Sequence, residues 1–419
     1  MREWTREPLA VVADIRLSSV DKKSIPGECA VRLCNYMDVY ANDYITENID
    51  FMEATATQAE IQRFRVERGD VLITKDSETP DDIGIPAVVV EEIEDLVCGY
   101  HVALLRPRRD RVNPTFLAKQ LASTESAAYF SRLANGSTRY GLSYGSIAAT
   151  PIRLAPRPQQ QRIAEILTTI DDAIEQTEAL ITKTQQIKAG LMHDLFTRGV
   201  TPDGQLRPRH DDAPQFYKES PLGWIPKEWE ISTLSGVVEF LDGRRVPLKE
   251  DERARIPGPI PYFGASGIID YIDRWLFEDE LILLGEDGEN LVSRSLPLAF
   301  KIAGKSWVNN HAHVLKPKAS QEIDFWTEAL EWRDYSNMTS GSAQPKITQG
   351  QLARMTVAVP LPSEQQQGAA ILASAGSRLV ADRDECTKLR DLRSGLMQDL
   401  LTGRVRVPVE ESPVAAANV

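Results

Sequence analysis

The chain is poor in cysteine and has no long apolar run. Only four of its 419 residues are cysteine, at positions 29, 34, 98 and 386. They form no CxxC pair, and only one of them, Cys98, has a histidine within ten residues, His101. Such scattered cysteines lack the ligand spacing of a zinc site and the pattern of a disulfide framework, so we expect reduced, buried thiols, no metal and no cofactor. No segment approaches the roughly 20 apolar residues of a membrane span, and the charged start MREWTREPLA differs from a secretory signal. These features predict a cytoplasmic protein.

The motifs of several enzyme classes are also missing. A nucleotide-hydrolysing protein would be expected to carry a GxxxxGK[ST] loop, and no such loop is present. A DNA methyltransferase needs a glycine-rich nucleotide loop and an aromatic, proline-rich tetrapeptide that receives the flipped base. The nearest segment, 113–116, is Asn-Pro-Thr-Phe and lacks the second proline. Asn113 as a helix N-cap with Pro114 in the first turn explains it better, and the equivalent segment near Asp324 also predicts a helix start. We therefore expect a noncatalytic chain.

Three polar segments imitate metal or nuclease sites. The turn 285–288 concentrates acids and glycines but does not continue as a calcium loop, so we expect a turn after a strand. His311 and His313 would share one face of a strand, yet the sequence shows no third ligand nearby, which favours a structural or DNA-facing role. The acidic stretch 76–82 lacks the lysine spacing of nuclease sites and is predicted to be a solvated loop.

The charge is acidic, with 48 lysines and arginines against 61 aspartates and glutamates and a net charge of -13. A protein that grips DNA phosphates unaided usually has a basic surplus. If this chain binds DNA, partner subunits must supply most of the cationic surface. The local basic segment 106–111 could contribute, although a solvated loop explains it equally well.

An internal repeat organises the sequence. GLMHDLFTRGV at 190–200 returns as GLMQDLLTGRV at 395–405, and 395 minus 190 gives an offset of 205. No gap is needed from residue 136 to residue 200. Further upstream, HVALLRP at 101–107 matches HAHVLKP at 311–317 with an offset of 210. The chain is thus two copies of one plan, a globular domain followed by a helical segment.

Both helical segments carry a heptad pattern, which predicts long helices that pair with each other. Pro158 and Pro362 mark the expected starts, and Gly199 and Gly403 the expected ends. Asp382 interrupts the apolar stripe of the second helix, which is therefore the weaker of the two. The apolar seam residues, which we take as candidates for subunit docking, are Ile163, Leu167, Ile170, Ile174, Ile181, Leu372, Leu379, Leu389 and Leu396.

The globular parts alternate short β-rich runs with helices, so each is predicted to be α+β. The expected fold is two mixed α/β domains in tandem, separated by two long helices that form an antiparallel coiled coil. The expected boundaries are 1–157 for the first domain, 158–200 for the central helix, 201–222 for a connector, 223–361 for the second domain, 362–405 for the C-terminal helix and 406–419 for a tail.

Several segments together resemble the specificity subunits of type I restriction-modification systems. They are the closing GLMxDLLTG, the run YFGASGIIDYID at 262–273, GEDGEN at 285–290, NNHAHVL at 309–315, and the segments 35–40 and 69–75. The resemblance implies that each domain is a target-recognition domain for one half of a bipartite site in double-stranded DNA. It also implies that two methyltransferase subunits dock on the helices and that endonuclease and translocase subunits join through them. A scaffold with two tandem ligand-binding domains and no DNA is the alternative.

The segments 135–140 and 340–346 occupy equivalent places in the two copies and combine hydroxyls, backbone amides and a cation, as DNA contacts require. Each could also be a simple loop before a strand. The candidate DNA-binding residues are Lys75, Ser137, Thr138, Arg139, Tyr140, Tyr262, Ser266, Asn309, Asn310, Ser342, Gln344 and Lys346.

Overall fold

The computed structural model describes residues 4–339 and 345–408, so the candidates Ser342 and Gln344 lie outside the described residues. The chain divides into two compact units, one made of residues 1–177 and 385–419 and the other of residues 178–384. Each unit contains one globular domain and a part of both long helices. Within the described ranges, no helix has the length and apolarity to cross a membrane.

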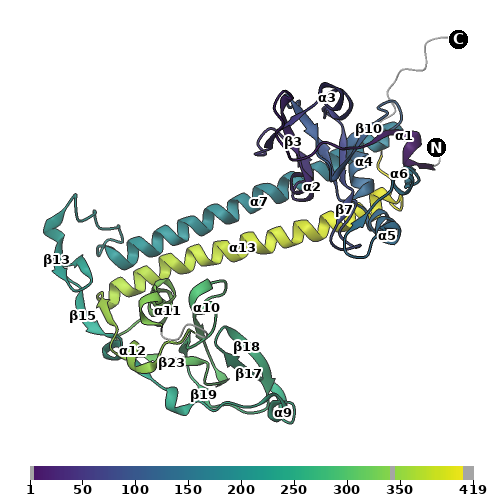
Figure 1. The fold of residues 1–419 in the computed structure, drawn as a ribbon. Helices are drawn as coiled ribbons and strands as arrows, with labels where there is room; N and C mark the ends of the chain where they lie inside the picture. Colours follow the sequence, from purple (N-terminus) through teal and green to yellow (C-terminus); the bar gives the residue numbers. More distant parts are fainter. Residues whose placement is uncertain (1–3, 340–344, 409–419) are drawn as a thin grey trace. The chain divides into compact units, whose positions relative to one another are not determined.

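The two predicted long helices are present as α7 (Arg157–Thr197) and α13 (Pro362–Leu401) (Figure 1). Gly199 and Gly403 follow their ends with positive φ angles of 59° and 73°, which a residue with a side chain would adopt only with strain. The helices pack together in antiparallel fashion within each unit. In the first, Arg393 Nε of α13 lies 2.5 Å from Asp171 Oδ1 of α7.

The second unit shows why Asp382 is tolerated at a core position of α13. Its side chain is buried, and so is that of Thr184 on α7. The Thr184 hydroxyl donates to Asp382 Oδ2 over 3.3 Å, and Arg378 Nε lies 2.8 Å from the other carboxylate oxygen. The polar residues of both heptads therefore face each other, and neither is left without a hydrogen bond.

The first domain is built on a five-stranded sheet of order β2-β10-β6-β8-β4 and a three-stranded sheet of order β5-β3-β9. The strand β6 reads Val-Leu-Ile-Thr and is buried on both faces, because its alternating side chains enter two different apolar clusters. Its strands are β1 (Thr5–Pro8), β2 (Ala13–Leu17), β3 (Cys29–Cys34), β4 (Tyr44–Ile45), β5 (Met52–Ala56), β6 (Val71–Thr74), β7 (Asp76–Ser77), β8 (Pro86–Val89), β9 (Leu96–Cys98), β10 (Val102–Pro107), β11 (Tyr140–Gly141) and β12 (Pro151–Leu154). Its helices before α7 are α1 (Leu9–Val12), α2 (Tyr36–Tyr40), α3 (Gln58–Phe64), α4 (Pro114–Leu121), α5 (Thr124–Leu133) and α6 (Tyr144–Ala148).

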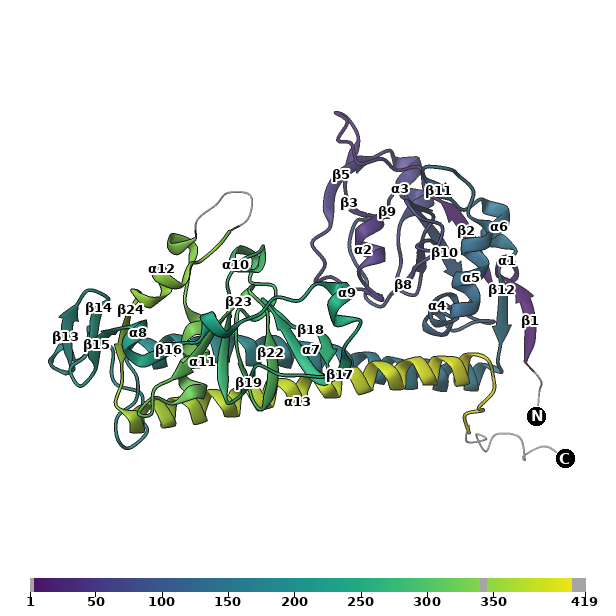
Figure 2. The same cartoon turned by 90° about the horizontal axis from the view of Figure 1, so that it is seen from below.

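The second domain repeats this plan, with sheets of order β16-β23-β20-β21 and β18-β17-β22-β19. Figure 2 shows β17, β18, β22 and β19 of the second sheet. The pairings β23–β20 and β17–β22 have the same directions as β10–β6 and β3–β9 in the first domain. Its strands are β13 (Tyr217–Ser220), β14 (Gly223–Pro226), β15 (Glu230–Thr233), β16 (Val238–Phe240), β17 (Pro257–Gly264), β18 (Gly267–Ile272), β19 (Phe277–Glu278), β20 (Leu281–Gly285), β21 (Ala299–Ile302), β22 (Lys305–Val308), β23 (Ala312–Pro317) and β24 (Thr356–Val359). Its short helices are α8 (Leu234–Val237), α9 (Glu250–Arg253), α10 (Asn290–Ser293), α11 (Ile323–Trp332) and α12 (Gln349–Ala353).

A buried glutamine ties the start of each long helix to its domain in the same way. Gln160 Oε1 accepts from the backbone N–H of Asn113 over 2.8 Å, and Gln365 Oε1 accepts from that of Glu322 over 2.9 Å. Both amide nitrogens donate to the carbonyl of the residue that follows β12 or β24. Asn113 in turn caps α4, since its Oδ1 accepts from Phe116 N–H over 2.9 Å, which confirms the predicted N-cap.

A second anchor holds the first domain to both helices. Asp171 of α7 lies 2.7 Å from Lys119 Nζ of α4 and 2.6 Å from the Tyr44 hydroxyl of β4, besides its contact with Arg393. Burial alone would raise the pKa of Asp171, but the neighbouring Lys119 and Arg393 and the Tyr44 hydroxyl hold it below its ordinary value. The Lys119 side chain is only 4% exposed, and its Nζ also lies 3.0 Å from Asp43 Oδ2, so two carboxylates offset the cost of burying the ammonium group.

Replacing Gln365 tests whether this buried glutamine anchors α13 to the second domain. Gln365→Leu should lower the free energy of unfolding by about 1–3 kcal/mol, because a buried N–H and a buried carbonyl lose their partner. The adjacent Gln366 is exposed, so Gln366→Leu is the matched control. Urea denaturation of both variants measures the difference. Equal stability of the two variants would contradict the anchoring role.

Replacing Asp171 tests the second anchor and gives it a pH signature. A carboxylate with a lowered folded pKa stabilises fully above its unfolded pKa, and the contribution is lost as the pH falls through the folded pKa. Asp171→Asn should therefore cost about 3 kcal/mol near neutral pH, with a difference from wild type that shrinks below about pH 4. Urea denaturation at pH 7 and at pH 3 measures this. Asp172→Asn, at the exposed neighbour, should have little effect at either pH.

Candidate nucleic-acid interface

One edge of the first domain's sheet gathers several of the predicted site residues. β6 ends there, followed by Lys75 and Asp76, and His101 stands just before β10. His101 Nδ1 lies 3.0 Å from Asp76 Oδ2, and Lys75 Nζ lies 3.3 Å from the same oxygen. The segment 135–140 reaches this edge through β11, in which Tyr140 pairs with Ser77.

The second domain has an edge of the same construction. Asp287 follows β20, His311 stands just before β23, and His311 Nδ1 lies 2.9 Å from Asp287 Oδ1. Lys346, at the end of the segment 340–346, forms a β-bridge with Asp287. In both domains a histidine–carboxylate pair therefore lies at the same edge, and one residue of a polar segment, Tyr140 or Lys346, pairs beside it.

Seven of the candidates lie at least partly open to solvent. Arg139, Asn310 and Lys346 are exposed, and the Lys346 Nζ lies 3.0 Å from Glu286 Oε1. Ser137 and Thr138 are exposed next to Arg139, and Ser266 is exposed in the turn between β17 and β18. Tyr140 is half-buried. These residues therefore present surface to solvent, although Lys346 is also bound within the chain.

Three other candidates are buried and hold the fold. Tyr262 is 1% exposed, and its hydroxyl accepts from the backbone N–H of Leu248 over 2.9 Å. Asn309 Oδ1 accepts from the backbone N–H of His311 over 2.8 Å. Lys75 is buried, with its Nζ 4.3 Å from the centre of the Tyr100 ring. Contrary to the sequence-based expectation, these side chains face the protein, and we leave them out of the proposed contacts.

The second domain also contains a buried cluster that sequence reasoning missed. Asp242, Glu286 and His313 bring ligand atoms within 4.8 Å of one another, although no third ligand was expected near His313. His313 Nδ1 lies 2.6 Å from Asp242 Oδ2, and its Nε2 lies 3.0 Å from the carbonyl of Ile347. No pattern could reveal the pair, because 71 positions separate the two residues.

Cations already neutralise this cluster. Arg245 Nη1 lies 2.5 Å from Glu286 Oε2, and Lys346 binds the other oxygen of Glu286. Burial alone would raise the pKa of Glu286, but the hydrogen bonds from Arg245 and Lys346 lower it. A metal ion would have to displace these cations, so the cluster is a structural network that fixes the position of Lys346.

The basic segment 106–111 lies at the other end of β10, away from His101. Arg106 Nη2 lies 2.8 Å from Asp70 Oδ2, and Arg111 Nη2 lies 3.3 Å from Glu7 Oε1. Arg108 Nη1 donates to the backbone carbonyl of Val11. These internal contacts support the structural explanation of the segment over a role at the recognition edge.

An aromatic group at the first domain's edge is a further feature that sequence reasoning missed. Tyr100 is 49% exposed, and its ring meets that of His101 edge-on with centroids 4.9 Å apart. Tyr36 and Tyr40 of α2 stack on each other with centroids 5.5 Å apart. In the sequence, the signal for this position was the repeat, which aligns Tyr100-His101 with Asn310-His311.

The heptad residues proposed for docking are largely used inside the chain. Ile163 and Leu167 lie in the core of the first domain, with Leu396 packed against it, and Leu372 packs with Leu195 in the second unit. Ile170 is buried too, and the remaining candidates, Ile174, Ile181, Leu379 and Leu389, are half-buried. Apolar side chains that do face solvent on the helices are Leu180, Ile187, Val380 and Leu392.

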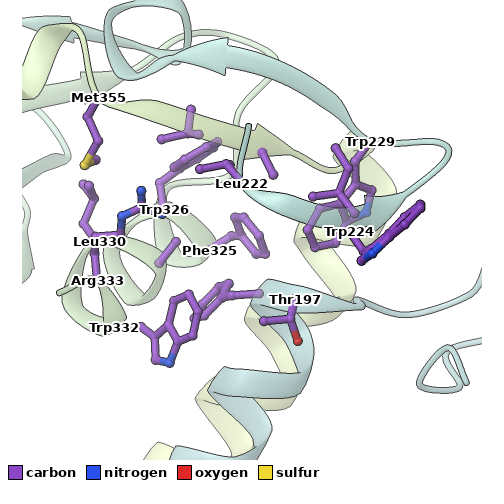
Figure 3. A pocket seen from close by; sticks show the side chains of 15 residues that line it. Thr197, Leu222, Trp224, Trp229, Phe325, Trp326, Leu330, Trp332, Arg333 and Met355 are labelled. Carbon is purple, nitrogen blue, oxygen red and sulfur yellow. The ribbon is translucent and has the colours of Figure 1, made fainter. Parts of the chain in front are cut away.

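A cavity of about 340 Å³ lies in the second unit beside the end of α7. Figure 3 shows Phe325, Trp326 and Trp332 of α11 around it, with Thr197 nearby. Arg333 is the one charged residue among those that line it. The described lining thus supplies no carboxylate, histidine or thiol for catalysis.

The matching family model and the similar proteins are both described as type I restriction specificity proteins. The family model described as type I restriction modification DNA specificity domain matches residues 12–187 and again residues 226–383. A Methanocaldococcus jannaschii protein named as the MjaX type I restriction enzyme specificity subunit is 23% identical over 360 residues, which cover 84% of this chain and 81% of the relative. A specificity subunit of the same description from Haemophilus influenzae is 32% identical over 146 residues, which cover 35% of this chain and 37% of the relative.

Solved structures share the fold over nearly the whole chain. The S subunit of a type I restriction-modification system from M. genitalium aligns with a TM-score of 0.62 and 16% identity, covering 95% of this chain and 96% of that one. A chain from a structure on complex assembly and conformational transition of the type I R-M system aligns with a TM-score of 0.55 and 16% identity, covering 96% and 98%. Two α/β domains with two long helices are thus an architecture found in solved S subunits.

Proposed function

The chain belongs to the family of type I restriction modification DNA specificity domains, and from this membership we propose that each of its globular domains binds one half of a bipartite site in double-stranded DNA. It is the DNA sequence-specificity subunit of such a system and is noncatalytic. Methyl transfer and cleavage belong to partner subunits. The recognition domains correspond to residues 1–157 and 223–361, with a connector at 201–222 and a tail at 406–419.

The duplicated edge is the observation that carries this proposal. His101 with Asp76 and His311 with Asp287 brace equivalent places, and a polar segment ends beside each pair. The side chains exposed there differ, with Arg139 in one domain and Lys346 in the other. The same backbone arrangement with different exposed side chains suits two domains that recognise different half-sites.

The acidity of the chain fits a shared grip on DNA. With a net charge of -13, the subunit cannot neutralise many phosphates by itself. The exposed cations at the edges, Arg139 and Lys346, would position each domain, while base contacts choose the sequence. Partner subunits would supply the remaining positive surface. We propose a cytoplasmic location, because the DNA substrate is found there.

We further propose that two methyltransferase subunits dock on the paired helices and that endonuclease and translocase subunits join through them. The surface available for docking is not the heptad seam, which is used internally. On α7, Leu180 and Ile187 are seven residues apart and so share a face, and they are 38% and 51% exposed. Val380 on α13 is 58% exposed in the same unit. Apolar groups of this kind on long helices suit a protein partner.

The scaffold alternative, with tandem ligand-binding domains and no DNA, is not favoured. It would explain the acidity but not the membership of a DNA specificity family.

Methylome sequencing tests the proposed function. The full chain is coexpressed with its methyltransferase partner in a host without adenine methylation, and methylated positions are mapped. We expect one asymmetric, split motif with methylated adenines, because each domain fixes one half-site. A complex that assembles and methylates without any common motif would overturn the proposal, and so would methyl transfer by the purified chain alone.

Copurification tests the docking surface. Replacing both Leu180 and Ile187 with Asp should weaken binding to the methyltransferase at least tenfold, because the charges would be buried against the partner. The globular domains should stay folded, since neither side chain enters a domain core. Val292→Asp, at a 63% exposed position of α10, is the matched control. Undiminished copurification of the double variant would place docking elsewhere.

A further inference from the structure

Tyr100 and Asn310 occupy the same position in the two recognition edges. Each stands directly before the braced histidine, and 310 minus 100 equals the 210-residue offset of the repeat. The preceding residues are also held alike. Gly99 N–H donates to the carbonyl of Cys34 at the end of β3 over 2.8 Å, and Asn309 N–H donates to that of Phe263 near the end of β17 over 3.0 Å.

The neighbouring side chains make hydrogen bonds within the domain, whereas the polar groups of these two side chains do not. His101, His311 and Asn309 all make internal hydrogen bonds. Within the described ranges, neither the Tyr100 hydroxyl nor the Asn310 amide has a hydrogen-bond partner, and both residues are exposed. The backbone beneath them is therefore fixed, while the side chains are free to contact something else.

Resting on the proposed function, we propose that this position selects a base in each half-site, through Asn310 in one domain and Tyr100 in the other. An asparagine amide offers one donor and one acceptor side by side, which matches the N6 and N7 edge of adenine in the major groove. Asn310 therefore selects an adenine. A tyrosine offers a single hydroxyl and a ring, so Tyr100 makes one polar contact and an apolar one, and the two half-sites differ.

Lys75 acts on this position through Tyr100. Its Nζ lies 4.3 Å from the centre of the ring and 3.3 Å from Asp76, which also binds His101. The ammonium group holds the ring from one side by a cation–π contact. Lys75 is thus a positioning residue and not a phosphate contact. At the equivalent place the second domain has Glu286, because the backbone N–H groups of Lys75 and Glu286 donate to the carbonyls of His101 and His311. There the small Asn310 side chain has no ring to support.

The experiment uses the full chain assembled with its methyltransferase and a DNA library with both half-sites randomised. Asn310→Asp removes the donor, so discrimination at one base pair of one half-site should fall about tenfold or more. Tyr100→Phe should change discrimination in the other half-site only. Each variant is the internal control for the other.

Asn48→Asp is the matched control for Asn310→Asp. Asn48 is exposed after β4, which runs parallel to β8, while β8 runs antiparallel to β6. Asn48 therefore lies at the opposite edge of the sheet, and the same chemical change there should leave both half-sites unaltered. In every library experiment, the wild-type complex should methylate a split motif.

Three results would overturn the inference and leave the proposed function standing. The first is wild-type discrimination in both half-sites by both variants. The second is an Asn310 and a Tyr100 variant that affect the same half-site. The third is an assembled variant complex that methylates no library member, since the residue would then be needed for the fold of the edge. A wild-type complex without any selected motif would instead refute the proposed function.

Discussion

The antiparallel pairing of the two long helices is the constraint on which both domains depend, because each domain's core is completed by the helix of the other copy. In the first unit, Leu400 and Leu401 at the end of α13 are buried in the same cluster as Ile163 at the start of α7. Gln120 of α4 donates to the carbonyl of Leu401 over 2.7 Å. In the second unit, Phe196 at the end of α7 packs against the domain core that holds Ala369 of α13. Neither copy of the repeat is therefore a self-sufficient folding unit.

The connector explains a difference in charge between the two copies at the starts of their long helices. Trp4 Nε1 donates to Gln159 Oε1 over 3.1 Å, and the equivalent Trp229 Nε1 donates to Glu364 Oε2 over 3.0 Å. Glu364 is a buried carboxylate, which needs a cation. Arg207 from the connector supplies it, and at the start of α7 the equivalent position carries the neutral Gln159. The charged residue occurs in the copy where the connector packs.

The sequence predicted the long-range plan better than the local sites. The helices were predictable because GLMxDL repeats without a gap and because proline and glycine mark their ends. The heptad residues are buried or half-buried, but an apolar stripe does not say whether its partner lies in the same chain, and Ile163 and Leu167 prove to be core residues of the first domain. The histidine–carboxylate braces join residues 25 and 24 positions apart, and only the sheet topology brings them together. Tyr262 illustrates the limit of motif resemblance, since it lies in a matching motif but faces inward.

The residues that hold each edge together differ from the residues that are exposed on it. This explains how the same edge structure can recognise two different half-sites. Asp76 and His101 contact each other, so a change in either would leave a polar group without its partner at a cost of about 1–3 kcal/mol. Within the described residues, the Tyr100 hydroxyl and the Asn310 amide make no internal hydrogen bond, and exposed groups of this kind usually tolerate substitution within about 0.5 kcal/mol. Their backbone is fixed by hydrogen bonds to β3 and β17, which do not depend on the side chain. Base selection can therefore change in one domain without refolding the edge and without affecting the other domain, which is the independence that a bipartite site requires.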